Sequence, residues 1–232
     1  MMWFLPLGDS ALLINFEQRI DPEINGKVIQ LYKSILSAQM PEVTFCSPAY
    51  CSITVGYDLA QTDFESLRQK IKGLEVEPAR SKKAKPIEIP VCYEDAYAPD
   101  MEDMELQSGL TSNEIIALHT TSVYQVYMIG FLPGFAYMGT LPEALKCKRK
   151  ETPRLRVPAR SVGLAGLQTG IYPSEAPGGW QIIGRTPRAI FSPLANLPCR
   201  FQPGDQVTFS SISESEFVQM ETDSNHPKNS VW

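Results

Sequence analysis

Hydrophobic residues in the first eighty positions follow two spacings, which predict a strand and then a helix. ALLINF at 11–16 is a short apolar run of the kind that forms a strand. Apolar side chains then recur every three or four residues, which predicts an amphipathic helix over 22–38. The residues at this helical spacing are Ile24, Val28, Leu31, Ile35 and Leu36. Asp21 and Pro22 suit the N-cap and the first position of that helix.

The rest of this first segment predicts a small α/β domain. Strands are predicted at 43–45 and 51–57, and a second helix at 63–71 before Gly73. The order strand, helix, strand, strand, helix favours a ferredoxin-like α/β sandwich over residues 1–80. We expect a strand from 74–78 or 86–91 to complete its sheet. The polar stretch 77–86 lies between prolines and is predicted to be a linker.

Short extended segments separated by glycine and proline dominate the chain after this linker. A strand at 87–93 and helices at 99–107 and from Thr111 to His119 come first. The extended segments that follow are 124–129, 155–158, 161–166, 180–184, 188–191 and 206–212. This spacing predicts a closed antiparallel β-barrel over 87–213, so the expected fold class is α+β. Residues 214–232 lack a sustained period and are expected to form a mobile C-terminal tail.

Charge and glycine are distributed unevenly along the 232 residues, whose net charge is −5. Residues 86–129 carry eight acids and no base. Residues 130–184 carry seven bases and three acids, and they hold nine of the fifteen glycines. We therefore expect any chemistry to be concentrated in residues 130–184.

Composition excludes several classes of function. The net acidity argues against nucleic acid as the main partner, and no apolar stretch reaches the ~18 residues that a membrane span needs. The N-terminal sequence does not have the pattern of a signal peptide, so none is expected. Five scattered cysteines predict reduced thiols in a cytoplasmic protein. With two histidines and no cluster of metal ligands, no metal site is expected.

The run GFLPGFAYMG at 130–139 is the most informative motif. Two Gly-Phe pairs flank a proline, which suits a loop of fixed shape that exposes aromatic faces. An equally good interpretation is a turn that seals the barrel, with Phe131, Phe135 and Tyr137 in the core. A rigid loop is compatible with both interpretations.

A basic run at 146–161 contains seven bases and one acid. Arg154 and Arg156 alternate with apolar residues, so on a strand both guanidinium groups would lie on one face. Guanidinium groups bind carboxylates and phosphates through paired hydrogen bonds, which predicts an anion site. The alternative is a solvated edge that prevents strand pairing, a role that suits the lysines of the run better.

The glycine-rich segment 161–187 matches neither of the nucleotide-binding glycine motifs. Glycine lets backbone amides approach an anion closely, and Gln168 and Thr169 add side-chain donors. The structural alternative is a set of hairpin turns, in which Gly178 and Gly179 position Trp180.

His119 is the one histidine outside the expected tail. Near a helix C-terminus it is either a catalytic acid or base, or a structural residue. The acidic block 94–105 is either a solvated helix face or an electrostatic partner of the basic run, and we favour the solvated face.

Five segments of the chain resemble a known family. They are LGDSALLINF near the start, PAYCSITVGYD (48–58), LHTTSVYQVYMIGFLPGFAYMGTLP (118–142), PRLRVPARSVGLAGLQTGIYPSEAPGGWQIIGRTP (153–187) and PGD (203–205). Together they resemble the family of the 5-oxoprolinase B subunit. This family also includes KipI-type kinase inhibitors and the subunit-1 domain of allophanate hydrolase and urea carboxylase systems.

The resemblance implies an α+β fold in which a ferredoxin-like domain is followed by a cyclophilin-like barrel. It implies an ATP-dependent 5-oxoprolinase, whose B subunit pairs directly with the C subunit. Together with the A subunit, these two convert 5-oxoproline to L-glutamate. ATP, with Mg²⁺, is the implied cofactor. The catalytic residues expected at family-matching positions are His119, Arg154 and Arg156. The expected substrate- or nucleotide-binding residues are Gly130, Phe131, Pro133, Gly134, Phe135, Ser161, Gln168, Thr169, Tyr172, Gly178, Gly179, Trp180 and Arg185.

Two other functions within the family stay open. One is a regulatory inhibitor that binds a sensor histidine kinase, and the other is a subunit that handles urea or allophanate. The chain also departs from the family at Arg160, where VPAGSVG is common. Unlike glycine, arginine adopts positive φ only with strain. The cation that it adds either alters the site or points outward.

Overall fold

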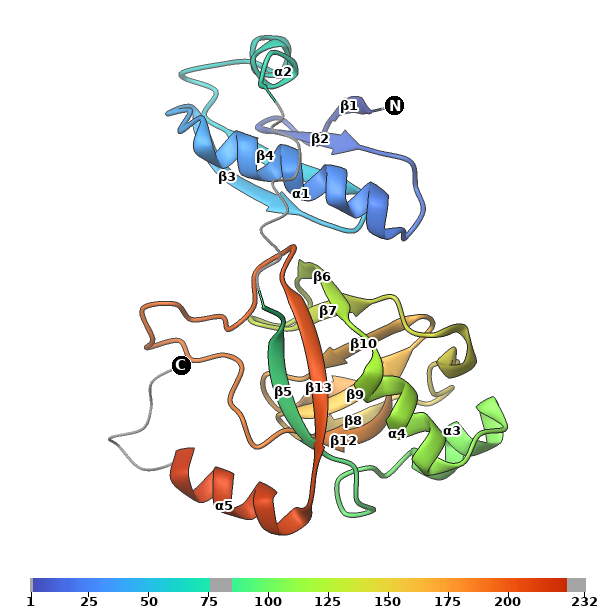
Figure 1. Cartoon of the computed structure of the whole chain (residues 1–232). Helices are drawn as coiled ribbons and strands as arrows, with labels where there is room; N and C mark the ends of the chain where they lie inside the picture. The colour runs from blue at the N-terminus through green and yellow to red at the C-terminus, as the bar shows by residue number, and fades with distance from the viewer. Residues whose placement is uncertain (1, 76–84, 225–232) are drawn as a thin grey trace. The chain divides into compact units, whose positions relative to one another are not determined.

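The structure is a computed structural model that describes residues 2–75 and 85–224. The chain divides into two units, Met1–Lys83 and Ala84–Trp232. The stretch expected to be a linker lies largely outside the described residues. Each unit has its own elements and its own core (Figure 1).

The first unit is built on a four-stranded antiparallel sheet in the order β1-β2-β4-β3. Its strands are β1 (Trp3–Pro6), β2 (Ala11–Asn15), β3 (Val43–Pro48) and β4 (Ser52–Tyr57). The predicted split βαβ is present, because β4 lies between β2 and β3. The predicted completion by residues 86–91 is wrong, because β1 takes the edge position and residues 87–92 belong to the second unit. The other predicted candidate, 74–78, lies mostly outside the described residues.

Two helices cover this sheet, α1 (Pro22–Ser37) and α2 (Phe64–Lys72). The Asp21 carboxylate accepts the backbone N–H groups of Glu23 and Ile24 at 2.9 and 3.1 Å, so the helix begins where the N-cap was predicted. Apolar side chains of both helices pack with those of β2 and β4 in one core cluster. This burial stabilises the unit.

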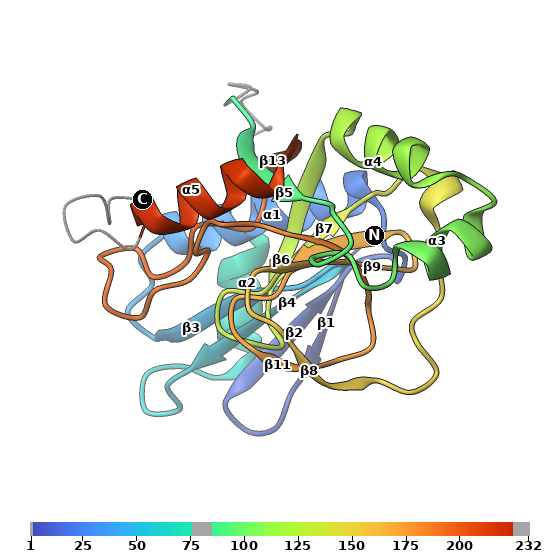
Figure 2. The same ribbon diagram turned by 90° about the horizontal axis from the view of Figure 1, so that it is seen from below.

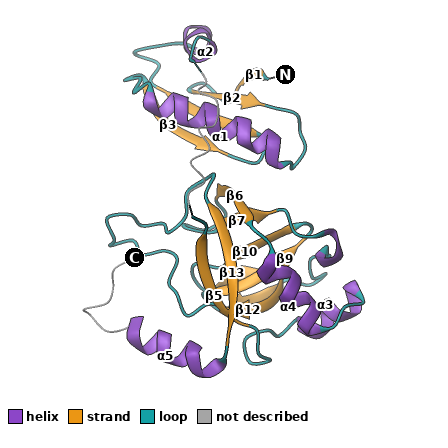
Figure 3. Ribbon diagram, viewed as in Figure 1, coloured by secondary structure: helices purple, strands orange, loops and turns teal. Residues whose placement is uncertain are grey.

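The second unit is a closed barrel in the order β10-β7-β6-β13-β5-β12-β9 (Figure 3). Its strands are β5 (Ile87–Cys92), β6 (Tyr124–Ile129), β7 (Ala136–Gly139), β9 (Ser161–Ala165), β10 (Gln168–Ile171), β12 (Gln181–Arg185) and β13 (Gln206–Ile212). The barrel departs from the predicted antiparallel form at one place, because β5 and β13 pair in parallel. These two strands lie at opposite ends of the unit's sequence, so no hairpin forces them to be antiparallel.

Helices and a short sheet lie outside the barrel wall. The helices are α3 (Met101–Ser108), α4 (Ser112–Thr121), α5 (Glu214–Ser224) and the 3₁₀ turn η1 (Glu143–Leu145). β8 (Arg154–Val157) pairs with β11 (Ala176–Gly178) in a separate two-stranded sheet. The predicted capping box is present, since Thr111 and Glu114 bind each other's backbone N–H groups. No helix in residues 2–75 and 85–224 is both long and apolar enough to cross a membrane.

Two predictions for the end of the chain are wrong for the described residues. The expected tail begins instead with α5, which runs beside β5 (Figure 2). Phe217 anchors it, because its ring is buried and lies 4.5 Å from the ring of Tyr97. Residues 188–191 form no strand and make a single β-bridge between Phe191 and Cys199. The last eight residues of the expected tail lie outside the described residues.

Candidate functional site

A buried carboxylate organises the basic run. Asp100 is 1% exposed and accepts both terminal nitrogens of Arg154, each at 2.6 Å. It also accepts the Lys150 ammonium at 2.7 Å and the backbone N–H of Ile182 at 2.7 Å. One side chain therefore joins the start of α3 to β8 and to β12.

These contacts determine the charge state of the cluster. Burial by itself raises the pKa of the Asp100 carboxyl, but hydrogen bonds from Arg154, Lys150 and the Ile182 N–H outweigh it, so the pKa is lower than usual. The hydrogen bond with Asp100 raises the pKa of Arg154. Asp100 is thus ionised at neutral pH and neutralised by its partners.

Arg154 already has an anionic partner within the chain, because both of its terminal nitrogens bind Asp100. The anion that the structure shows at Arg154 is thus the Asp100 carboxylate, and binding of an external anion by Arg154 stays a prediction. Arg156 differs, since its side chain is 82% exposed and lies 3.6 Å from Glu175. Both arginines lie on β8, but Arg154 is bound to a buried carboxylate whereas Arg156 is exposed. The two guanidinium groups therefore do not form one common binding face.

His119 belongs to the core of the barrel unit. Its ring is fully buried, stacks on Phe209 with centroids 4.4 Å apart, and hydrogen-bonds through Nδ1 to the Tyr93 hydroxyl at 2.7 Å. Nε2 lies 3.1 Å from the Thr169 hydroxyl, which itself donates to the Gly163 carbonyl at 3.2 Å. Burial lowers the pKa of His119 to about 3. The structural alternative therefore describes His119 and Thr169 better than a catalytic one.

The aromatic loop contributes mainly to packing. Phe135 is buried, and its ring lies 5.2 Å from that of Tyr172 and 5.4 Å from that of Trp180. Burial raises the pKa of Tyr172. Phe131 departs from this pattern, because it is 62% exposed and takes a left-handed backbone conformation with φ 69°. The core interpretation holds for Phe135 and not for Phe131.

At two positions a neighbouring aromatic side chain comes so close to the backbone that only glycine fits. A Cβ at Gly134 would lie 2.6 Å from the Cβ of Phe191, and the residue also has φ +85°. A Cβ at Gly178 would lie 2.2 Å from the Tyr172 hydroxyl oxygen. Both glycines are therefore required by close packing against an aromatic ring.

The other expected residues are spread over several elements. Gly130 and Pro133 lie in the loop between β6 and β7, and the Gly130 N–H donates to the Phe135 carbonyl at 3.0 Å. Gln168 begins β10 opposite Ala165. The Gly179 carbonyl accepts the Lys150 N–H at 2.7 Å.

Arg185 and Ser161 lie at paired positions of β12 and β9. Ser161 is buried. The Arg185 Nε donates to the Ala159 carbonyl at 2.9 Å, and burial lowers the pKa of Arg185. Neither residue joins the cluster around Asp100.

Arg160 reaches α5. It adopts φ 70° although it is not glycine, its Nη1 donates to the Pro187 carbonyl at 2.9 Å, and its Nη2 binds the Glu221 carboxylate. Its cation is therefore paired with a carboxylate of α5.

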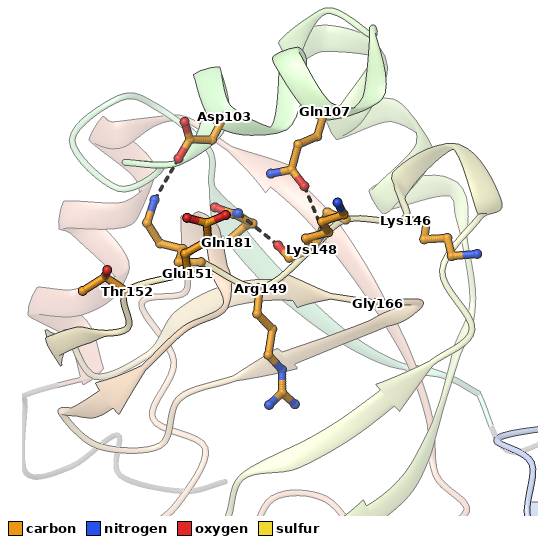
Figure 4. A pocket seen from close by; sticks show the side chains of 11 residues that line it. Asp103, Gln107, Lys146, Lys148, Arg149, Glu151, Thr152, Gly166 and Gln181 are labelled. Atoms are coloured by element: carbon orange, nitrogen blue, oxygen red, sulfur yellow. Dashed lines mark hydrogen bonds and ion pairs between the residues drawn. The ribbon is translucent and has the colours of Figure 1, made fainter.

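A cleft lies between α3 and the segment 146–152 (Figure 4). Its volume is about 800 Å³. Its lining residues are Asp103, Gln107, Lys146, Cys147, Lys148, Arg149, Lys150, Glu151, Thr152, Gly166 and Gln181. The Asp100 cluster borders it, because Lys150 bridges Asp100 and Asp103.

The cations of this cleft differ in their partners. Lys146 pairs with Glu143 at 2.7 Å, and Lys150 pairs with Asp103 at 2.8 Å. Lys148 and Arg149 form no ion pair with any residue of the described segments. The cleft is thus the place where the basic run keeps unpaired charge.

The acidic block 94–105 contributes two carboxylates to this site. The acidic block was favoured as a solvated face, whereas Asp100 and Asp103 are electrostatic partners of Lys150 and Arg154. Pairing of the block with the basic run was the other stated interpretation. In the described part of the chain, no group of three or more His, Cys, Asp or Glu side chains is placed to hold a metal ion.

Comparison with known proteins agrees with this architecture. The family model described as "Carboxyltransferase domain, subdomain C and D" matches residues 2–201, so the chain belongs to that family. Curated relatives carry a more particular name, that of the B subunit of 5-oxoprolinase. The relative from Bacillus subtilis (strain 168) is 39% identical over 94% of this chain and 96% of its own length. The relative from Escherichia coli O157:H7 is 36% identical over 88% of this chain and 93% of its own length. The resemblance inferred from the sequence motifs is confirmed.

A solved structure shares the fold. The crystal structure of TTHA0988 superposes with a TM-score of 0.81 at 34% sequence identity and covers 88% of this chain. This chain corresponds to 40% of that longer chain. The α+β architecture with a closed barrel is thus found in an experimentally determined relative.

Proposed function

We propose that this chain is the B subunit of an ATP-dependent 5-oxoprolinase. In this proposal it acts with the C and A subunits to convert 5-oxoproline to L-glutamate while ATP is hydrolysed. One observation carries the proposal: relatives named as the B subunit of 5-oxoprolinase match this chain at 36 and 39% identity over nearly its whole length and theirs. The five free cysteines are compatible with a cytoplasmic location, which we include in the proposal.

The proposed reaction needs an activated amide. A lactam carbonyl is a poor electrophile, and phosphorylation of its oxygen by ATP, which releases ADP, makes the ring carbon easier to attack. Water adds to that carbon, the ring C–N bond breaks as the nitrogen takes a proton, and a second water hydrolyses the resulting acyl phosphate to glutamate and phosphate. Cationic donors held in advance around the phosphates and the developing negative charge would favour this step. In this chain Arg154 is occupied by Asp100, whereas Lys148, Arg149 and Arg156 have no such buried partner.

The test is reconstitution of the complex. The chain is co-expressed with candidate C and A subunits encoded in the same genome, and release of ADP and glutamate is measured with and without 5-oxoproline. We expect the chain to co-purify with the C subunit, and we expect ATP turnover to depend on 5-oxoproline and on all three proteins. Active partner subunits without any requirement for this chain would refute the proposal. Inhibition of a sensor histidine kinase, or turnover of urea or allophanate instead, would replace it with one of the alternatives.

A further inference from the structure

We infer that the cleft between α3 and residues 146–152 binds the phosphate groups of a nucleotide. The inference deepens the proposed function, on which its choice of ligand rests, by placing the nucleotide on this chain. It moves the site from the arginines of β8 to Lys148 and Arg149. It is argued from charge, from rigidity and from size.

Charge is the first argument. The lining contains four cations and two acids, in a chain whose net charge is −5. Asp103 is already neutralised by Lys150, so Glu151 is the remaining acid. Lys148 and Arg149 have no carboxylate partner in the described segments. Figure 4 shows the Arg149 side chain directed away from α3, so the two cations lie at different parts of the lining and would contact different phosphate groups of a nucleotide.

Rigidity is the second argument. The Lys148 N–H donates to Gln107 Oε1 at 2.9 Å, and its carbonyl accepts Gln181 Nε2 at 3.1 Å. Next to it, Cys147 and Gly166 exchange two backbone hydrogen bonds of 2.8 and 3.2 Å. The segment that carries the free cations is therefore fixed to α3 and to the barrel before a ligand arrives, which reduces the entropy lost on binding.

Size and polar lining favour a nucleotide over a single small anion. A volume of about 800 Å³ lies within the range of ligand pockets, ~300–1,000 Å³, and exceeds what one phosphate or one 5-oxoproline fills. Gln181 is 3% exposed, and its Oε1 has no hydrogen-bond partner in the described structure. It can accept from an N–H or O–H group, which a nucleoside has and a fully ionised phosphate lacks.

The acids of the cleft suit the Mg²⁺ that accompanies a nucleotide. Mg²⁺ is usually bound by one or two protein carboxylates together with substrate phosphates and water. Glu151 offers a carboxylate in the same lining as the cations, whereas the carboxylate of Asp103 is bound by Lys150. Mg²⁺ would thus arrive with the phosphates and would require no separate metal site in the chain.

The test compares charge removal inside and outside the cleft. Lys148→Gln, Arg149→Gln and the double variant are made in the full chain. The matched control is Lys27→Gln with Lys33→Gln, which removes two exposed cations from α1. Calorimetry measures the Kd of MgATP, with tripolyphosphate and 5-oxoproline as separate probes. The KM for ATP is measured with the assembled complex.

We expect each single variant to weaken MgATP binding about tenfold, and the double variant more, because a hydrogen bond to a charged group contributes about 1.5–3 kcal/mol. The control is expected to bind like the parent chain. Tripolyphosphate is expected to bind more weakly than MgATP but to be affected by the same substitutions.

The inference is overturned if MgATP binds neither the chain nor the complex, or if the double variant keeps the parental Kd and KM. Normal 5-oxoproline-dependent turnover with an unchanged KM would reject the cleft and leave the proposed function standing. If the parent chain binds MgATP, the double variant does not, and neither supports 5-oxoproline turnover, then the cleft is confirmed as the nucleotide site and the proposed function is rejected. Preference for 5-oxoproline over MgATP in the cleft would also overturn the inference.

Discussion

Asp100 and Arg154 form a two-point ion pair, with both Nη–Oδ distances at 2.6 Å, between the start of α3 and β8. β8 does not belong to the barrel and pairs only with β11 in the described structure. The ion pair therefore supplies the connection between this short sheet and the helical side of the unit. Because the same carboxylate accepts the Ile182 N–H, barrel strand β12 is fixed by it as well.

Removal of Arg154 is expected to destabilise the protein rather than to affect only a ligand. Arg154→Ala removes two hydrogen bonds to the buried Asp100 carboxylate but leaves Lys150 as its charged partner, so the expected loss is about 2 kcal/mol. Urea denaturation of the full chain measures this loss as a lower unfolding midpoint at unchanged slope.

Arg156→Ala is the matched control for this prediction. The same residue type is removed from the same strand, but its side chain is 82% exposed and 3.6 Å from Glu175. The expected change in the free energy of unfolding is below about 0.5 kcal/mol. Equal stability losses in the two variants would show that the pair with Asp100 contributes little.

His119 makes stability depend on pH in the mildly acidic range. Its pKa in the folded chain is about 3, whereas an exposed histidine titrates near 6.5. Below pH 6.5 the unfolded chain binds a proton that the folded chain does not, so stability falls as the pH drops and the loss is complete near pH 3. At pH 5 this amounts to about 2 kcal/mol relative to neutral pH.

The measurement is denaturant unfolding at several pH values between 7.5 and 5, made in a His226→Gln background so that His119 is the one remaining histidine. In His119→Gln, the free energy of unfolding is expected to stay constant between pH 7.5 and 5, whatever its value at pH 7.5. Turnover of the assembled complex should fall by less than tenfold, since removal of a general acid or base costs ~10²–10⁴. A persisting slope would contradict the assignment of the pH dependence to His119, and a larger loss of turnover would restore its catalytic role.

The sequence predicted those parts of the fold that depend on local patterns. Helical spacing and capping located α1 and the capping box of α4, because the atoms involved lie within one turn of each other. Partners of strands are set by contacts between distant segments. The edge position of β1 and the parallel pairing of β5 with β13 therefore left no mark on the local pattern.

The candidate site was harder to predict for a related reason. Arg154 and Lys148 have the same sequence signature, a cation in a basic run. What separates them is that Asp100, more than fifty positions away, binds Arg154 and leaves Lys148 free. Residue type shows which chemistry is available, but only the tertiary structure shows which groups are already used.

The largest buried contact of helix α5 is expected to be that of one side chain, Phe217. Phe217 is buried beside Tyr97, whereas most of the helix surface is exposed. Phe217→Ala removes about 3 kcal/mol of packing, which is enough to detach a helix of this length. Hydrogen exchange of residues 214–224 should become at least tenfold faster, while exchange in the barrel strands changes little. Val218→Ala is the control, because Val218 is 51% exposed on the same helix. Slow exchange of α5 in Phe217→Ala would show that other contacts hold it.

Arg160 combines an unfavourable backbone conformation with a favourable side-chain contact, and two substitutions separate them. Arg160→Ala keeps a Cβ at φ 70° and loses the bonds to Glu221 and to the Pro187 carbonyl. Arg160→Gly loses the same bonds but relieves the left-handed strain, which costs a residue with a side chain about 1 kcal/mol. We therefore expect the glycine variant to be more stable than the alanine variant by about that amount in urea denaturation. In both variants, α5 should exchange hydrogen faster than in the parent chain. If alanine is as stable as glycine, the backbone at this position is not strained, and the arginine is retained for its contact with α5 alone.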